Sequence, residues 1–365
     1  MKIAVDARTL GSKPSGVGMY LNDFLKVLIE YKDLEFVLIT DVAESEYIKY
    51  FIRQGIDVRV RGTSTYKSPG VLAYFSFVQR ELDDIKPDIF WEVNAIIPKK
   101  LKGSFKTMVT IHDMFPVQYM QYFGLIYSIY FKMGLKKTLK NTDFILYNSN
   151  QTKLTTENIF PDAADIRNCT AYIISHPLKH KWNNTDKGYL LYIGNMEKRK
   201  GVDLLMKGYL RYKELGGNKP LVLAGKMLEP DIEELINEVR EATETVTYMD
   251  YVTNRKKHQL YSECSCFVFP SKAEGFGMPV IEVMKFEKPI LVSNLDIYKE
   301  VAGGAVNEFD INCDEEQQID NLANAMISYD KKVDTEAYKE VIERYKPDRL
   351  GKKVYDFIME NMEEN

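Results

Sequence analysis

The sequence has few cysteines and no long apolar run. The four cysteines, Cys169, Cys264, Cys266 and Cys313, lack the paired spacing of metal ligands, which favours a reducing compartment. No stretch approaches the apolar length of a membrane span, and the opening MKIAVDARTL reads as a strand, without the features of a signal peptide. We therefore expect a cytoplasmic protein, either soluble or peripheral on the inner face of the membrane.

Neither sign of charge dominates, and no internal repeat is visible. The 365 residues contain 49 Lys and Arg against 53 Asp and Glu, a net charge of −4, which gives no electrostatic reason to expect a nucleic-acid partner. An apolar content of 45% is typical of a globular protein, and the length suggests two domains.

Short apolar runs alternate with helical patterns in both halves of the chain, which predicts parallel sheets covered on both faces. Expected strands are 3–7, 36–40, 58–60, 89–93, 108–112, 144–147 and 172–175, then 189–193, 221–224, 246–249, 267–269 and 290–292. The polar stretch 179–187 (KHKWNNTDK) reads as a linker. We expect an N-terminal domain over 1–180, a C-terminal domain over 188–345 and a final helix over 346–365 that packs back on the first domain.

Residues 266–284 (CFVFPSKAEGFGMPVIEVM) read as a strand, a glycine loop and a helix that begins near Pro279. Glu274 and Glu282 bracket the loop and could accept hydrogen bonds from sugar hydroxyls. The backbone amides of Phe276, Gly277 and Met278 could donate to a diphosphate. A purely structural interpretation is about equally supported by spacing alone, because acidic residues in a first helical turn complement the helix dipole.

The run EGFGMPVIE resembles the signature of the retaining glycosyltransferases of the GT-B fold, specifically the large fourth family. This resemblance implies an α/β fold with two Rossmann-like doubly wound domains that face a central cleft. It also implies that Glu274 contacts the donor sugar as a catalytic residue and that Glu282 holds the ribose.

The segment GNMEKRKGVDLL places Arg199 and Lys200 before a helix, where two cations oppose the dipole and favour an anion. A solvated basic turn is the commoner outcome for such a cluster taken alone. The resemblance implies that the pair holds the donor diphosphate. Some relatives have Arg at the position of Asn195 in this chain, and that Arg could take the place of Arg199. Lys200 is therefore the better supported of the two candidate diphosphate contacts. Tyr251 and Val252 lie where relatives contact the nucleobase.

In the first half, residues 11–18 (GSKPSGVG) form a glycine loop after a strand, without the three-glycine spacing of the dinucleotide fingerprint. A structural turn is about as well supported as a binding loop. The resemblance implies that this loop faces the donor diphosphate, which makes Gly16 and Gly18 candidates.

Parallel sheets bind ligands beyond the carboxyl ends of their strands. That rule selects five residues: Asp6, Asn94, His112, Asp113 and Asn148. A single His at a strand end is more often a capping or packing residue. The resemblance instead implies that His112 is a catalytic residue beside the reacting sugar. From its position, we expect Asp113 to orient His112 or to cap the next segment.

Residues 115–140 are dense in aromatic side chains and end with Lys132, Lys136, Lys137 and Lys140. This pattern is compatible with an amphipathic helix that meets a membrane surface or a lipid-linked acceptor. A core helix with a solvated basic end is favoured, because aromatic stripes are usually buried.

The resemblance implies a retaining glycosyltransferase that moves a hexosyl unit from a nucleoside diphosphate sugar to a glycan or lipid-linked acceptor in cell-surface polysaccharide biosynthesis. DAR, SGVG, TIHDMFP and the RKG loop look most like bacterial polysaccharide mannosyltransferases, so GDP-mannose is the first expected donor and a UDP-sugar the second. The sequence contains no Asp-x-Asp, and we expect no metal and no other cofactor.

Two other functions stay open on the sequence. One is a nucleotide-sugar epimerase or hydrolase on the same scaffold, and the other is a non-catalytic two-domain binding protein, which should carry a signal peptide. The sequence does not specify the donor base, donor sugar, acceptor, linkage or oligomeric state.

Overall fold

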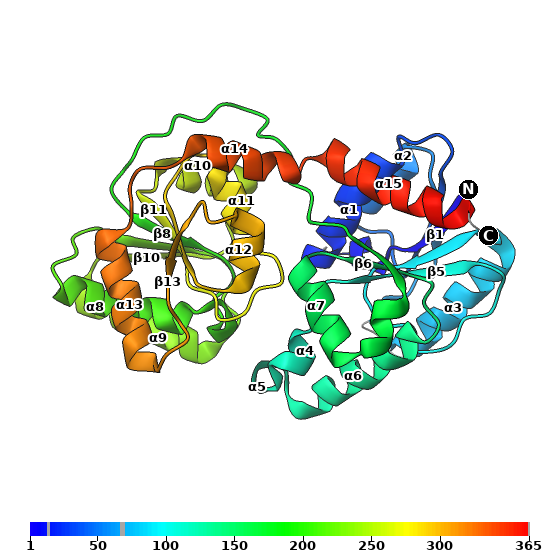
Figure 1. Cartoon of the computed structure of the whole chain (residues 1–365), viewed down its shortest axis with the longest axis horizontal. Helices are drawn as coiled ribbons and strands as arrows, with labels where there is room; N and C mark the ends of the chain where they lie inside the picture. Colours follow the sequence, from blue (N-terminus) through cyan, green and yellow to red (C-terminus); the bar gives the residue numbers. More distant parts are fainter. Residues whose placement is uncertain (13–14, 66–69, 364–365) are drawn as a thin grey trace. The chain divides into compact units, whose positions relative to one another are not determined.

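The structure is a computed structural model that describes residues 1–12, 15–65 and 70–363 (Figure 1). The chain divides into two compact units. Unit 1 comprises Met1–Ile174 and Tyr345–Asn365, and unit 2 comprises Ser175–Arg344. The stretch 179–187, which the sequence predicts as a linker, lies within unit 2, because the chain leaves unit 1 at residue 174.

Unit 1 contains a seven-stranded parallel sheet in the order β3-β2-β1-β4-β5-β6-β7. Its central strands are short runs of buried apolar side chains, as expected for a sheet covered on both faces. The strands are β1 (Lys2–Asp6), β2 (Glu35–Thr40), β3 (Asp57–Val60), β4 (Ile89–Glu92), β5 (Lys106–Ile111), β6 (Phe144–Tyr147) and β7 (Arg167–Thr170).

The helices of unit 1 are α1 (Gly16–Leu28), α2 (Glu46–Arg53), α3 (Gly70–Ile85), α4 (Phe115–Gln118), α5 (Met120–Phe123), α6 (Leu125–Leu139), α7 (Asn150–Ile159) and α15 (Pro347–Glu363), with short 3-10 turns at η1 (Arg8–Leu10) and η2 (Pro161–Asp165). Figure 1 shows α15 running beside α1. Gly351 permits this approach, since a Cβ there would lie 2.1 Å from Val27 Cγ1, and Tyr355 stacks on Tyr31 with ring centroids 4.0 Å apart. The last helix is therefore part of unit 1.

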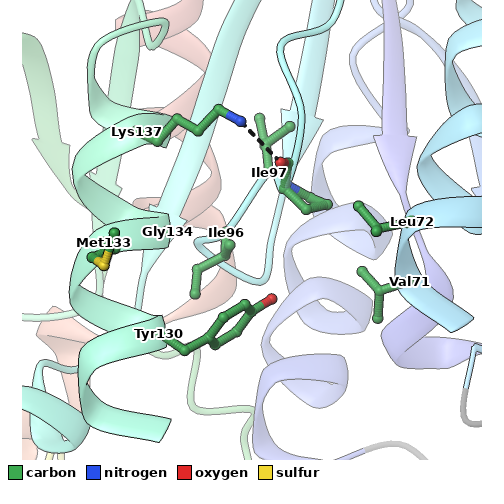
Figure 2. Close-up of a pocket in the computed structure, with 9 residues that line it drawn as sticks. Val71, Leu72, Ile96, Ile97, Tyr130, Met133, Gly134 and Lys137 are labelled. Atoms are coloured by element: carbon green, nitrogen blue, oxygen red, sulfur yellow. Dashed lines mark hydrogen bonds between the residues drawn. The ribbon is translucent and has the colours of Figure 1, made fainter. Parts of the chain in front are cut away.

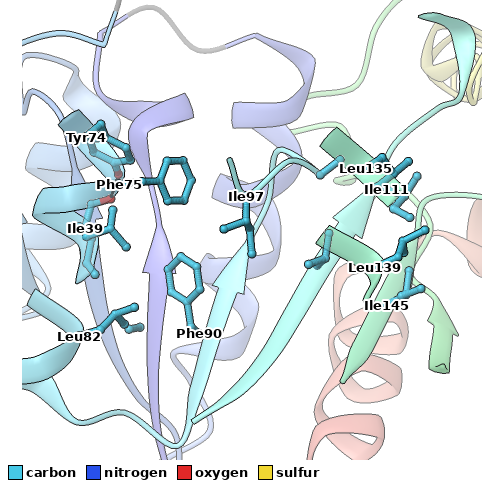
Figure 3. Packing of buried hydrophobic residues seen from close by; sticks show 14 of the residues in the cluster. Ile39, Tyr74, Phe75, Leu82, Phe90, Ile97, Ile111, Leu135, Leu139 and Ile145 are labelled. Atoms are coloured by element: carbon cyan, nitrogen blue, oxygen red, sulfur yellow. Dashed lines mark hydrogen bonds between the residues drawn. The ribbon is translucent and has the colours of Figure 1, made fainter. Parts of the chain in front are cut away.

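The core of unit 1 forms where α3 and α6 cover the sheet (Figure 3). Tyr74 and Phe75 of α3 and Leu135 of α6 are buried in the same cluster as Phe90 and Ile145 of the strands. The inner face of α6 is thus fixed by packing against the sheet.

Unit 2 contains a six-stranded parallel sheet in the order β10-β9-β8-β11-β12-β13. Its strands are β8 (Leu190–Ile193), β9 (Leu221–Ala224), β10 (Val246–Met249), β11 (Cys266–Phe269), β12 (Ile290–Ser293) and β13 (Asn307–Phe309). Its helices are η3 (Lys198–Lys200), α8 (Val202–Glu214), α9 (Pro230–Thr243), α10 (Asn254–Glu263), α11 (Met278–Met284), α12 (Asp296–Ala302), α13 (Glu315–Ser328) and α14 (Thr335–Arg344). Each unit therefore has the alternation of strands and helices that the sequence predicts.

The prediction of a strand at 172–175 is wrong, and β13 was not predicted. In place of 172–175, the last strand of unit 1 is β7, whose sequence RNCT is mostly polar. Both β7 and β13 lie at the edge of their sheet. An edge strand has one neighbour and needs less apolar surface, so it can lack the apolar run that marks a central strand, as β7 and β13 do.

Candidate active site

The predicted strand, glycine loop and helix are present in unit 2. Strand β11 ends at Phe269, a loop follows, and α11 begins at Met278 with Gly277 as its N-cap at φ 87° and ψ 44°. A Cβ at Gly277 would lie 2.7 Å from Tyr298 Cε1, so both the backbone conformation and the close approach of a buried tyrosine require glycine here. The loop that carries Glu274 is therefore held in one shape at its carboxyl end.

Lys200 and Glu274 meet in an ion pair between Lys200 Nζ and Glu274 Oε2. Their side chains are only 15% and 11% exposed. Ser271 Oγ lies 3.4 Å from the same carboxylate, and the Lys200 ammonium lies 5.5 Å from the centre of the Phe269 ring. Two residues that are 74 positions apart in the sequence thus form one charged, largely desolvated pair, in which electrostatic interactions are stronger than on an open surface.

Arg199 joins the same two segments through different contacts. Its guanidinium donates to Glu197 Oε1 at 2.6 Å and to the Ala273 carbonyl at 3.1 Å. The Arg199 carbonyl in turn accepts from the Lys272 amide at 2.9 Å. Arg199 therefore fastens the loop that carries Glu274 to the turn that carries Lys200. The sequence had assigned both cations directly to an anion, whereas here each of them already contacts a carboxylate.

The turn that presents Lys200 depends on Gly201, which has φ 69° and caps η3. A Cβ at this position would lie 1.9 Å from the Pro270 carbonyl oxygen, a backbone atom that cannot move aside cheaply. Glycine is thus required both by its left-handed backbone and by its contact with the end of β11.

We expect Gly201→Ala to destabilise unit 2 by about 2–4 kcal/mol, because it adds a backbone clash to left-handed strain. Gly216→Ala is the matched control: Gly216 has φ 87°, but a Cβ there would meet nothing within 4 Å. That control should cost only about 1–2 kcal/mol. Urea unfolding of both variants measures the difference, and equal losses would show that Pro270 is not the constraint.

Glu282 contacts a second pair of residues, which the sequence did not predict. Lys257 Nζ lies 2.7 Å from Glu282 Oε1, and the Tyr261 hydroxyl donates to Oε2 at 3.0 Å. Both partners lie four residues apart on α10, and burial raises the pKa of the Tyr261 hydroxyl well above its usual range, so it stays a donor. The i, i+4 spacing of Lys257 and Tyr261 is visible in the sequence and places both side chains on one face of a helix. It does not reveal that this face contacts Glu282.

The two carboxylates that bracket the loop thus contact different cations. Among the other predicted donor contacts in unit 2, Phe276 and Gly277 are buried and Met278 is the first residue of α11. Tyr251 follows β10 and is 81% exposed, and Val252 beside it is half-buried. Their assignment to the base stays a prediction.

In unit 1, His112 directly follows β5 and is only partly exposed. Its Nε2 lies 3.0 Å from the Val93 carbonyl, and its ring packs edge-on against Tyr20 with centroids 4.8 Å apart. A carbonyl can only accept, so Nε2 carries the proton and Nδ1 is left as an acceptor. Asp113 accepts from the Phe115 amide at 3.1 Å, which fits the predicted capping role.

Burial of the imidazole lowers the pKa of His112 to about 4, although the hydrogen bond to Val93 acts in the opposite direction. The unfolded chain takes up this proton near its ordinary value of 6.5. The folded state therefore loses stability as pH falls from about 6.5 to about 4. Above that window the ring is neutral and can accept a hydrogen bond.

We expect the His112 ring proton in NMR spectra to titrate with a midpoint near pH 4. The chain has four histidines, and the resonance that is missing from His112→Gln assigns the signal. A midpoint near 6.5 would contradict the buried, neutral imidazole described above.

The predicted glycine loop of unit 1 leads into α1. Helix α1 begins at Gly16, and Gly18 is buried in its first turn. A Cβ at Gly16 would meet nothing within 4 Å, so the fold does not require glycine there. Residues 13 and 14 of the predicted loop lie outside the described residues. The donor contacts assigned to Gly16 and Gly18 stay predictions.

Asp6, at the end of β1, belongs to a buried charge network. Arg8 lies 3.2 Å from both Asp6 and Glu92, and the Tyr74 hydroxyl donates to Asp6 at 2.7 Å. Burial and the neighbouring Asp6 raise the pKa of Glu92 well above its usual range. The backbone amide of Asn94 donates to Glu92 Oε1 at 2.8 Å. These contacts fix the ends of two adjacent strands, which is a structural role.

Asn148, at the end of β6, is buried. All four cysteines are free thiols. Among the described ranges, no three His, Cys, Asp or Glu side chains are grouped to hold a metal ion, and no helix has the length and apolar character needed to cross a bilayer.

Comparison with known proteins places this arrangement in a family. Residues 177–345 match the family described as "Glycosyl transferases group 1". Over 336 residues the chain is 26% identical to O-antigen chain mannosyltransferase B of Escherichia coli, covering 84% of this chain and 85% of that protein. O-antigen chain mannosyltransferase RfbU of Salmonella typhimurium is 21% identical over 317 residues, covering 81% and 83%. Residues 177–345 thus belong to the group 1 glycosyltransferases, and the chain is related to bacterial O-antigen mannosyltransferases.

Solved structures confirm the predicted fold class. A crystal structure of Anabaena HepE in complex with UDP and glucose matches with a TM-score of 0.70 at 16% identity, covering 99% of this chain and 100% of that one. Sucrose-phosphate synthase from Thermosynechococcus elongatus matches with a TM-score of 0.73 at 14% identity, covering 100% of both chains. The two units are the Rossmann-like domains of a GT-B glycosyltransferase.

Proposed function

We propose that this glycosyltransferase moves a mannosyl unit from GDP-mannose to a glycan or lipid-linked acceptor in cell-surface polysaccharide biosynthesis, on the cytoplasmic side of the membrane. The single observation that carries the proposal is the Lys200–Glu274 ion pair on the glycine loop of the group 1 domain. A carboxylate for sugar hydroxyls and a cation for a diphosphate lie side by side there, within a largely desolvated setting.

We infer a sugar transfer in one step, in which Lys200 acts on the diphosphate and Glu274 on the sugar. The acceptor oxygen forms a bond to C1 of the sugar on the face from which the diphosphate leaves, and the bond from C1 to the phosphate oxygen breaks. The departing phosphate takes the acceptor's proton, which gives a glycoside and a nucleoside diphosphate. Lys200 Nζ offsets the charge that develops on the diphosphate, and Glu274 accepts hydrogen bonds from the sugar.

His112 would add a neutral acceptor. Its low pKa leaves the imidazole uncharged at neutral pH, and its Nδ1 is free of the Val93 contact. A neutral ring beside the sugar could accept a hydrogen bond from a sugar hydroxyl without repelling positive charge that develops at C1. This assignment supports same-face attack, in which no enzyme carboxylate needs to form a bond with the sugar.

The choice of donor rests on the named relatives. The two mannosyltransferases resemble this chain over more than four fifths of its length. The HepE structure, which contains UDP and glucose, is only 16% identical and supports the fold rather than the sugar. GDP-mannose is therefore the first donor and a UDP-hexose the second.

A donor screen by thermal shift tests the proposal. GDP-mannose at a large excess over its Kd should raise the unfolding temperature, since a ligand at about 100 times its Kd stabilises the folded state by about 2.7 kcal/mol. UDP-glucose should give a smaller shift. A larger shift with a UDP-sugar would overturn mannose as the donor. Stabilisation by no nucleotide sugar would overturn the whole proposal.

Incubation with labelled GDP-mannose distinguishes transfer from the two alternative reactions on this scaffold. Transfer should place the label in a glycan or lipid-linked product. Free labelled mannose would indicate a hydrolase, and a changed nucleotide sugar would indicate an epimerase.

A further inference from the structure

The outer face of α5 and α6 is apolar and exposed, contrary to the favoured expectation that residues 115–140 form a core helix. Leu125 is 62% exposed, Ile126 88% and Met133 69%, and Ile129 and Tyr130 are each about half exposed. The opposite face of α6, with Phe131, Leu135 and Leu139, is buried in the core of unit 1. A helix that is apolar all round is normally covered on both sides. We call Leu125, Ile126, Ile129, Tyr130 and Met133 the α6 outer face.

Positive charge adjoins this apolar surface toward the C-terminal end of α6. Lys132, Lys136, Lys137 and Lys140 are all exposed, and no Asp or Glu occurs between residues 114 and 142. The whole chain is acidic, with a net charge of −4. The basic character is therefore local to the helix that presents the exposed apolar side chains. Apolar side chains flanked by lysines are the pattern that inserts into anionic lipid.

An apolar pocket opens beside the α6 outer face (Figure 2). It has a volume of about 600 Å³ and lies between α6 and the first turn of α3. Its walls are Val71, Leu72, Ile96, Ile97, Pro98, Tyr130, Met133, Gly134 and Lys137. Lys137 is the charged residue among these, and its Nζ donates to the Pro98 carbonyl at 3.2 Å, as Figure 2 shows.

The apolar lining of the pocket suits a hydrocarbon chain. Leu72 and Met133, on opposite walls, are both largely exposed and leave apolar surface facing solvent. A second hollow, lined by Phe123, Gly124, Leu125, Ile126, Tyr127 and Tyr130, continues the apolar surface along the start of α6. Tyr130 lines both hollows and connects them into one surface. Contiguous exposed apolar surface of this kind marks an interaction site.

We propose that the α6 outer face, with its flanking lysines and the adjoining pocket, docks unit 1 on an anionic lipid bilayer. Leu125, Ile126, Ile129 and Met133 enter the boundary between headgroups and acyl chains. Lys132, Lys136 and Lys140 contact the anionic headgroups, and the pocket receives one hydrocarbon chain. We infer a lipid occupant rather than a protein because this surface is basic although the chain as a whole is acidic. A local basic surface of this kind is attracted to anionic headgroups. The inference goes beyond sugar transfer and does not depend on which donor is used.

Vesicle flotation with the full chain tests this surface. The protein should float with vesicles of phosphatidylcholine containing about one third phosphatidylglycerol and bind pure phosphatidylcholine about tenfold more weakly. Raising the ionic strength should weaken the anionic binding, because the lysine contacts are screened.

Paired variants separate the apolar and charged contributions. Leu125→Ser with Ile126→Ser should lower binding to anionic vesicles about tenfold or more, and Lys132→Ser with Lys136→Ser should remove most of the preference for anionic lipid. Leu154→Ser and Lys153→Ser on α7 are matched controls at exposed or half-exposed positions of the same unit and should bind like the wild type. All these changes lie at the surface, so circular dichroism should report unaltered folding.

Two outcomes would overturn the proposal. One is vesicle binding that the α6 variants leave unchanged. The other is a wild-type protein that ignores both vesicles but forms a dimer that Leu125→Ser with Ile126→Ser dissociates in light scattering, which would make this face a contact between two copies of the chain.

Discussion

Replacing Glu274 by Gln is expected to lower kcat by about 10²–10³ with little change in KM for the donor. Gln keeps the size of the side chain but removes the negative charge that pairs with Lys200 and that we propose accepts hydrogen bonds from the sugar. An interaction that strengthens only in the transition state acts on kcat, so the loss should appear there. Steady-state kinetics with the donor selected by the thermal screen measure it.

Glu315→Gln is the matched control for this change. Glu315 also forms an ion pair with a lysine of unit 2, Lys207, but both side chains are exposed and lie on α13 and α8. Such exposed pairs contribute little, so the control should keep wild-type kinetics. Thermal unfolding of both variants checks that lost activity is not lost folding. Unchanged kcat in Glu274→Gln would remove this carboxylate from the reaction.

The second large effect is expected at Glu282. Glu282→Gln should raise the Kd for the donor about 10–100-fold and leave kcat nearly unchanged, because a hydrogen bond to a charged group is worth about 1.5–3 kcal/mol. The proposed contact is with the ribose, which does not react. Isothermal titration with the nucleoside diphosphate measures the affinity without turnover.

Tyr261→Phe tests whether the partners of Glu282 position its carboxylate. This variant keeps the charge but removes the donor that lies 3.0 Å from Oε2, so the Kd should rise about 3–10-fold. Tyr209→Phe is the control, because that buried tyrosine bonds to Thr245 at 2.8 Å instead. Equal affinity losses in both variants would mean that Tyr261 acts through general stability and not through Glu282.

The sequence predicted much of the fold because central strands of a parallel sheet are short, fully apolar runs. Strands such as β6 and β9 have the expected bounds, since both faces of these strands must be buried. The edge strands β7 and β13 were missed because their sequences, RNCT and NEF, are mostly polar, whereas the edge strands β3 and β10 have more apolar residues. The last helix, α15, packs against α1 of unit 1, and Gly351 permits its close approach to Val27.

The site was partly predictable for a different reason. Gly277 and the start of α11 follow from local chemistry, because a left-handed residue before a helix favours glycine. The resemblance assigned Lys200 and Glu274 to one donor but did not predict their ion pair, since no local rule joins residues so far apart. Lys257 and Tyr261 were missed because their partner Glu282 lies on another helix.

The surface of α6 shows the limit of reasoning from periodicity. Apolar residues recur on both faces of this helix, so the sequence alone favoured a buried helix. The sheet covers only the face with Leu135 and Leu139, and the face with Ile126 and Met133 stays open. A pattern records which residues are apolar, but which of them are covered depends on the number of neighbouring layers.

A crystal structure of the protein with a bound nucleoside diphosphate would show whether Lys200 and Glu274 bind the donor. We expect diphosphate oxygens within hydrogen-bond distance of Lys200 Nζ, with the Glu274 carboxylate directed at the position of the sugar. A nucleotide bound elsewhere on unit 2, with the Lys200–Glu274 pair intact and remote from it, would exclude this site.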